Sequence, residues 1–217
     1  MKKAISAAIL ASTLTMTAGL STSAMALEGV SGNVGVVSQY FFRGIAQTGT
    51  ASASAGLDYE NGGFYLGTWG ADVQDGLEVD FYGGYGFEFD SGLALSAGFT
   101  TYQYTGDFDS AYNEVNLSAS FGLFSVGYNV GTHEEDTGLG IPESDYDFIS
   151  ATFEYEGFYG TFGTWGQDFE GDYFEFGYGA EVSGFDVGLA IIVNSEELDV
   201  ETGEGEESMV LSIGKSF

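Results

Sequence analysis

The sequence contains no cysteine, one proline and one histidine, and only four of its 217 residues are lysine or arginine. Without cysteine the chain has neither disulfide bonds nor thiolate metal sites. The 33 aspartates and glutamates leave no basic surface for nucleic acid, so we expect no nucleic-acid partner. Beyond residue 26 the longest apolar run without glycine, residues 189–193, falls far short of the ~18 residues of a transmembrane helix.

Glycine and aromatic residues are abundant instead. The chain has 35 glycines, and phenylalanine, tyrosine and tryptophan together make up 16% of it. Each glycine inside a helix costs ~1 kcal/mol relative to alanine, so this composition argues against a helical bundle. Disordered chains are poor in aromatic residues. Both observations favour an all-β fold.

The first 26 residues have the organisation of a secretory signal peptide. Lys2-Lys3 precedes an apolar stretch over residues 4–20, and Ala24-Met25-Ala26 matches a cleavage site. We expect residues 1–26 to be removed and residues 27–217 to form one exported domain; a retained membrane helix is the alternative. Removal leaves two basic residues against 33 acidic ones, a formal charge of 2 − 33 = −31.

Apolar and polar residues alternate along most of the remaining chain, as in strands that have one apolar face. In one segment Leu77, Val79 and Phe81 alternate with Glu78 and Asp80. The alternation predicts twelve strands, at residues 30–42, 49–60, 63–72, 77–89, 93–104, 111–121, 123–131, 145–155, 158–167, 172–183, 185–194 and 207–217.

The connections between these strands alternate in length without exception. Longer polar connections such as 132–144 and 195–206 follow the odd-numbered strands, and tight turns such as Asn61-Gly62 follow the even-numbered ones. This alternation is typical of an up-and-down antiparallel transmembrane β-barrel, here of about 12 strands, with short periplasmic turns and long outer loops. We therefore predict a barrel in the bacterial outer membrane, surrounded by outer-membrane lipid. A soluble barrel with its apolar face inward is the alternative.

In the transmembrane barrel the polar face lines the interior. The predicted pore-lining residues are Arg43, Asp58, Trp69, Glu78, Asp80, Glu114, Glu154, Trp165, Glu175 and Glu181. Most of them are acidic, and an acidic lumen favours cations over anions. We expect Arg43 to point inward near the outer end of the first strand, where it pairs with an acid such as Asp80 or Glu175 or forms an anion site. Alternatively, the acids lie there only because that face contacts water, or the negative charge of the chain reflects a saline habitat.

The two tryptophans are placed by the turns that precede them. An Asn61-Gly62 turn of type I′ puts Trp69 on the inner face. A turn at Glu156-Gly157 pairs Trp165 with Phe148, also on the inner face. The alternative is that both tryptophans belong to the belt at the membrane interface.

Residues with catalytic or metal-binding potential are few. The single histidine, His133, precedes a run of acids and has no nucleophile nearby, so we expect it to be a solvated loop residue. The acidic segments 107–109 and 201–207 lack the spacing of a calcium-binding loop. We predict no catalytic residue, no metal and no cofactor, and therefore no enzyme.

The end of the chain resembles the C-terminal strand signature of outer-membrane barrels. Phe217 is terminal, and apolar residues alternate before it from Met209, although Lys215 departs from the pattern. The resemblance implies recognition by the barrel assembly machinery.

The segment Ser31-Gly-Asn-Val-Gly-Val-Val-Ser-Gln-Tyr-Phe-Phe-Arg-Gly44, with Gly67-Thr-Trp-Gly70 and the closing Lys215-Ser-Phe217, resembles the family described as TorF porins. The same family is also described as the Gcw_chp conserved hypothetical family. The resemblance implies an outer-membrane barrel with a transport role and carries no catalytic residues.

The sequence thus predicts an outer-membrane, porin-like channel for small solutes that prefers cations. The alternative is a closed barrel with a structural, adhesive or ligand-binding role.

Overall fold

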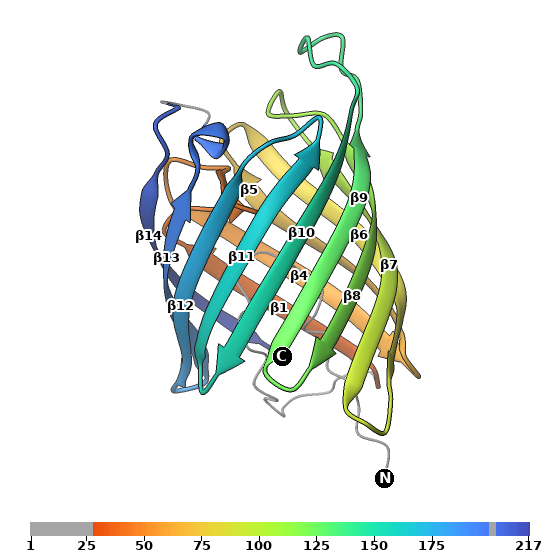
Figure 1. The fold of residues 1–217 in the computed structure, drawn as a ribbon. Helices are drawn as coiled ribbons and strands as arrows, with labels where there is room; N and C mark the ends of the chain where they lie inside the picture. The colour runs from red at the N-terminus through yellow and green to blue at the C-terminus, as the bar shows by residue number, and fades with distance from the viewer. Residues whose placement is uncertain (1–27, 200–202) are drawn as a thin grey trace.

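The computed structural model describes residues 28–199 and 203–217. The proposed signal peptide and part of the acidic segment 201–207 lie outside these residues. In the described chain, twelve antiparallel strands close into one barrel in which each strand pairs with its neighbours in sequence and β1 pairs with β14 (Figure 1). The barrel strands are β1 (Val30–Val37), β4 (Ser52–Asn61), β5 (Phe64–Val73), β6 (Gly76–Glu88), β7 (Leu93–Tyr104), β8 (Tyr112–Phe121), β9 (Phe124–His133), β10 (Ser144–Tyr155), β11 (Phe158–Gln167), β12 (Asp172–Val182), β13 (Phe185–Asn194) and β14 (Glu207–Ser216).

The apolar face of each strand points away from the barrel axis. Along β12, Phe174, Phe176 and Tyr178 are exposed, whereas Glu175 and Gly177 between them point inward and are partly or fully buried. The same alternation recurs around the barrel and leaves a continuous outer surface of large apolar side chains. A soluble barrel would bury this face, so the predicted transmembrane type of barrel is confirmed and the soluble alternative is wrong. In the described residues no helix is both long and apolar enough to cross a membrane.

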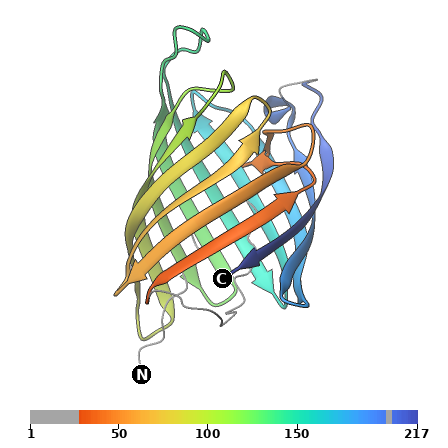
Figure 2. The same cartoon turned by 180° about the vertical axis from the view of Figure 1, so that it is seen from behind.

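The connections differ at the two ends of the barrel. Four of the five turns at one end, beginning with Gly62-Gly63, contain two residues, while the loop 134–143 and the described parts of the last connection, residues 195–199 and 203–206, extend from the other end (Figure 1). The loop between β5 and β6 is an exception, since only residues 74–75 separate these strands. The predicted strict alternation of long and short connections is therefore wrong at this point. Phe217 lies at the short-turn end of the barrel (Figures 1 and 2).

The first tight turn lies one residue later than the sequence suggests. It consists of Gly62 and Gly63, with φ of 60° and 93°, and pairs Asn61 with Phe64. Positive φ at both central residues is what a type I′ turn requires, and two glycines satisfy it better than asparagine and glycine. The register shifts by two residues, so the side chains keep their faces. The prediction of the Glu156-Gly157 turn is confirmed, and Phe148 pairs with Trp165.

The first predicted strand, 30–42, is the main error in the sequence-based assignment. β1 ends at Val37, and residues 38–51 turn into the lumen as an inner hairpin that contains β2 (Phe41–Phe42) and β3 (Ile45–Ala46). Arg43 and Gly44 form its tip with φ of 49° and 86°, a left-handed turn that no continuous strand could contain. Figures 1 and 2 show this hairpin in orange near the long-loop end of the barrel.

The interior outside the hairpin has hydrogen bonds between neighbouring strands. Ser96 and Ser118 form a hydrogen bond of 2.7 Å across two strands, and Thr152 and Thr161 form one of 2.9 Å. The inner hairpin packs into the long-loop half of the barrel.

Candidate functional site

The candidate site is the part of the lumen that the inner hairpin fills. The hairpin leaves the wall between β1 and β4, and its tip is bonded to β8, β11 and β13. The indole Nε1 of Trp165 on β11 donates to the carbonyl oxygen of Arg43 at 3.1 Å, and the Asn194 amide on β13 donates to that of Gly44 at 2.9 Å. The hairpin thus spans the lumen from one wall to the other.

The guanidinium of Arg43 forms a bidentate ion pair with Glu114 on β8. Its two N–H groups lie 2.9 and 2.7 Å from the carboxylate oxygens, and the residues are 3% and 1% exposed. Tyr102 and Tyr146 donate to the same carboxylate at 2.8 and 3.0 Å. Burial acts to lower the pKa of Arg43, but the adjacent Glu114 outweighs it and raises that pKa, so Arg43 stays charged.

Aromatic rings surround the Arg43 guanidinium as well. It lies 4.6 Å from the ring centre of Phe148 and 4.8 Å from that of Phe42. Such cation–π contacts are strongest where the cation has lost its water. The ion pair and the rings together fix the tip of the hairpin in the lumen.

Two further carboxylates lie beside the hairpin on β6. Glu78 is 1% exposed and accepts a hydrogen bond of 2.7 Å from the Tyr40 hydroxyl, while Asp80 is 8% exposed. Within the described residues, Oε2 of Glu78 and Oδ1 of Asp80 have no hydrogen-bond partner. Burial and the nearby Glu78 raise the pKa of Tyr40, which keeps its hydroxyl protonated as a donor. Three buried acids therefore surround the hairpin that carries Arg43.

The remaining predicted acids lie closer to the short-turn end. Asp58 and Glu175 are half-buried and accept hydrogen bonds from Tyr82 and Tyr159. A Cβ at Gly67 would collide with Asp58 and Tyr82, and one at Gly177 would collide with Tyr159, so these glycines make room for the pairs. Glu154 and Glu181 also take inward positions but are exposed, near the turns.

The two tryptophans lie inside the barrel, and neither belongs to an interface belt. Trp69 is half-buried and packs edge-on against Tyr40, with ring centres 5.7 Å apart. Trp165 is buried and packs against Phe42 and Phe148. Both tryptophans therefore contact aromatic residues of the inner hairpin.

The structure changes the expected positions of two residues. Arg43 points inward, but from the hairpin rather than from the first strand, and its partner is Glu114 rather than Asp80 or Glu175. The prediction of a solvated histidine is wrong: His133 ends β9, is 8% exposed and stacks on Tyr112 with ring centres 4.0 Å apart. Its Nε2 lies 2.9 Å from Asp109 Oδ1. His133 is buried because strands β8 and β9 extend far enough for their inward residues to pack together at the long-loop end.

Several contributors to the site are not identified by the sequence, namely Tyr40, Tyr102, Tyr146 and Asn194. For Tyr102, Tyr146 and Asn194, only the strand register distinguishes their inward positions. Tyr40 lies in a hairpin whose sequence resembles the end of a strand. In residues 28–199 and 203–217, no group of three or more histidine, cysteine or acidic side chains is placed to hold a metal ion.

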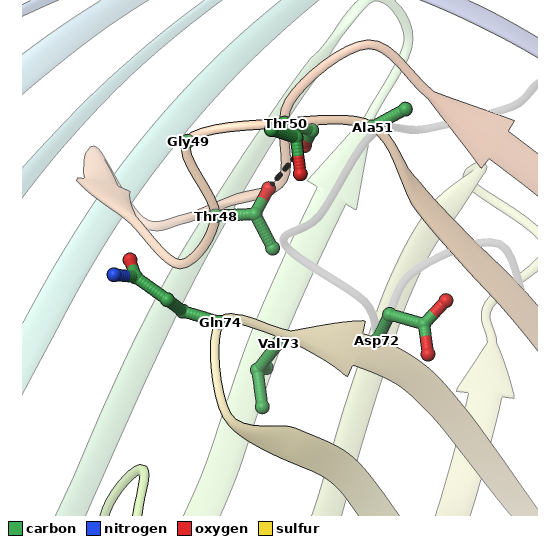
Figure 3. Close-up of a pocket in the computed structure, with 7 residues that line it drawn as sticks. All are labelled: Thr48, Gly49, Thr50, Ala51, Asp72, Val73 and Gln74. Carbon is green, nitrogen blue, oxygen red and sulfur yellow. Dashed lines mark hydrogen bonds between the residues drawn. The ribbon is translucent and has the colours of Figure 1, made fainter.

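A pocket of ≈ 410 Å³ lies where the hairpin returns to the wall. It is lined by residues 48–51 on one side and by Asp72, Val73 and Gln74 at the end of β5 on the other (Figure 3). The Thr48 hydroxyl donates to the carbonyl oxygen of Thr50 at 2.7 Å and closes the local turn (Figure 3). The hairpin is therefore not packed against the wall along its whole length.

The family described as "Bacterial protein of unknown function (Gcw_chp)" matches residues 21–164, which is more than half of the chain. No curated protein matches the sequence. Among solved structures, the KdgM porin is similar over 86% of this chain and 98% of its own, with 8% identity and a TM-score of 0.56. A second structure, from work on the in-meso crystallization of membrane proteins, is similar over 86% of this chain and 83% of its own, with 10% identity and a TM-score of 0.58. At these identities the likeness establishes the fold.

Proposed function

We propose that this chain, which belongs to the Gcw_chp family of bacterial proteins, is an outer-membrane channel for small solutes that prefers cations. The observation that carries this proposal is the charge of the constricted lumen. Glu78, Asp80 and Glu114 are buried around the inner hairpin, where Arg43 supplies one positive charge. Low-dielectric walls strengthen the field of such acids, which attracts cations and repels anions.

The porin-like barrel and its apolar outer surface support the location in the outer membrane. We propose in addition that residues 1–26 are a cleaved signal peptide, that residues 27–217 form the barrel domain, and that the barrel assembly machinery recognises its last strand. We also propose that the chain is one of the porins described as TorF, which its segment 31–44 resembles. A channel of this kind needs no catalytic group, and we propose that the protein is not an enzyme.

The proposal is tested by the reversal potential of the purified protein in planar bilayers under a salt gradient. Asp80 on β6 and Glu175 on β12 lie on strands at opposite sides of the closed barrel. The double variant Asp80→Asn, Glu175→Gln should lower the cation selectivity of the channel and bring the reversal potential closer to zero. The difference should shrink at 1 M salt, where the Debye length is ~3 Å.

The matched control is Asp90→Asn with Glu143→Gln, which removes the same charge from two exposed connections. It should leave the reversal potential unchanged. An unchanged potential in the interior variant at low salt would mean that these acids do not line the path.

A closed barrel with a structural, adhesive or ligand-binding role is the second candidate. It is favoured by the inner hairpin, which fills the long-loop half of the lumen with buried side chains. Absence of conductance from a well-folded wild-type preparation would select this function over the channel.

A further inference from the structure

We propose that the inner hairpin, residues 38–51, is a movable gate that the Arg43–Glu114 ion pair holds in its closed position. The inference rests on the proposed function, because a gate acts on transport only in a barrel that conducts. The movement itself can be detected without any measurement of conductance.

The hairpin is attached differently from the rest of the barrel. Its own short ladder joins Phe41 to Ala46 and Phe42 to Ile45, and neither strand pairs with a strand of the barrel. Its tip is joined to the wall by side chains, through Glu114, Trp165 and Asn194. Its base is joined to the wall by backbone hydrogen bonds, from Ser38 N to the Leu211 oxygen at 2.8 Å and from Gln74 N to the Gln47 oxygen at 3.1 Å. The tip, residues 41–46, can therefore swing about this base without breaking a strand pair of the barrel.

The Arg43–Glu114 ion pair is suited to be the latch. The intact pair contributes little net stability, whereas removal of one partner is strongly destabilising. Both charged groups of the Arg43–Glu114 pair have lost their water, and this desolvation offsets much of their attraction. Movement of the hairpin out of the lumen would return Arg43 to water, which recovers its hydration. Removal of either partner leaves the other buried without its bidentate ion pair and favours the outward position.

There is space at the base of the hairpin for this movement. The ≈ 410 Å³ pocket separates residues 48–51 from the end of β5 (Figure 3). Gly49 and Thr50 are exposed and both line this pocket. A Cβ at Gly49 would meet no atom within 4 Å. Residues 49–51 of the returning limb can therefore adjust within this space while Gln47 stays bonded to Gln74.

Trp165 reports the position of the hairpin because its indole N–H donates to Arg43 and its ring packs against Phe42. In a Trp69→Phe background, Trp165 is the only tryptophan in the chain. In that background Glu114→Gln should shift its emission to longer wavelength and increase quenching by acrylamide several-fold. In bilayers the same variant should spend a larger fraction of time in the conducting state.

Arg43→Gln is the second variant, for the case that Glu114→Gln does not assemble, and it should have the same two effects. Lys215→Gln is its matched control, since it removes the same charge from an exposed position on β14. Heat-modifiable mobility in gels shows that each variant has folded.

The outcomes separate the two proposals. Increased quenching together with increased open time supports the gate. Increased quenching without conductance in any variant supports movement of the hairpin and overturns the channel. Unchanged quenching and unchanged open time in both folded variants overturn the gate and leave the channel standing.

Discussion

At the scale of single residues, the buried carboxylates of the interior differ in how many of their oxygens accept a hydrogen bond. Both oxygens of Glu114 are bonded, by Arg43, Tyr102 and Tyr146. Glu78 has a donor on one oxygen only, the hydroxyl of Tyr40. A buried polar atom that loses its partner costs more than a satisfied one contributes. Each donor to these acids should therefore matter individually.

Tyr40→Phe should lower the free energy of unfolding by about 1–3 kcal/mol, because it leaves Glu78 without this donor. Tyr65→Phe is the matched control, since the buried Tyr65 hydroxyl has no hydrogen-bond partner in the part of the chain that the structure describes, and its removal should be neutral or stabilising. Urea unfolding in lipid vesicles measures both. Equal losses in the two variants would show that the Tyr40 bond has no special role.

At the scale of elements, a strand is predictable from its sequence where it has a lipid side and an interior side. The alternation of Phe174 and Phe176 with Glu175 follows directly from that environment, and it places β12 correctly. Strands β2 and β3 of the inner hairpin pair with each other and not with the described barrel strands, so they lack a lipid side and an interior side. Its Phe41-Phe42 pair resembles the end of a strand, and its partners Trp165 and Asn194 lie more than a hundred residues away in sequence.

The candidate site is predictable from the sequence where its residues lie on barrel strands, because those strands alternate between the lipid side and the interior side. Inward direction follows from the parity of each position along its strand, and parity alone is enough to identify Glu78, Asp80, Glu114 and Trp165 as interior residues. Which inward residues meet depends on the tilt of the barrel and on the hairpin, and neither is determined by local sequence. The Arg43–Glu114 pair and the burial of His133 depend on such long-range contacts, so they do not follow from the strand pattern.

Gly44→Ala should destabilise the hairpin by about 1–3 kcal/mol, because φ is 86° at this position. Its new Cβ would also lie 2.8 Å from the Cβ of Tyr173. Gly49→Ala, where a Cβ meets nothing, is the control and should have little effect. Urea unfolding gives the loss of stability, and Trp165 emission shows whether the hairpin tip has moved. An equal response of both variants would contradict the assigned role of the tip.

At the scale of the whole molecule, the barrel is asymmetric along its axis. The inner hairpin and the longest loops lie at one end, while four two-residue turns and Phe217 lie at the other (Figures 1 and 2). Short turns on the periplasmic side are usual for bacterial barrels. The hairpin would then lie near the outer opening, where the proposed gate would control entry from outside.

This orientation can be tested because the chain has almost no sites for trypsin: no lysine or arginine occurs between Arg43 and Lys215. Thr137→Lys introduces one site into the exposed loop 134–143, and Ser91→Lys introduces one into an exposed connection at the opposite end. Trypsin added to intact cells should cut the Thr137→Lys protein and leave the Ser91→Lys protein whole. After permeabilisation of the outer membrane both should be cut, which shows that the second site is accessible in itself. Cleavage of Ser91→Lys alone in intact cells would mean that the barrel is inserted the other way round.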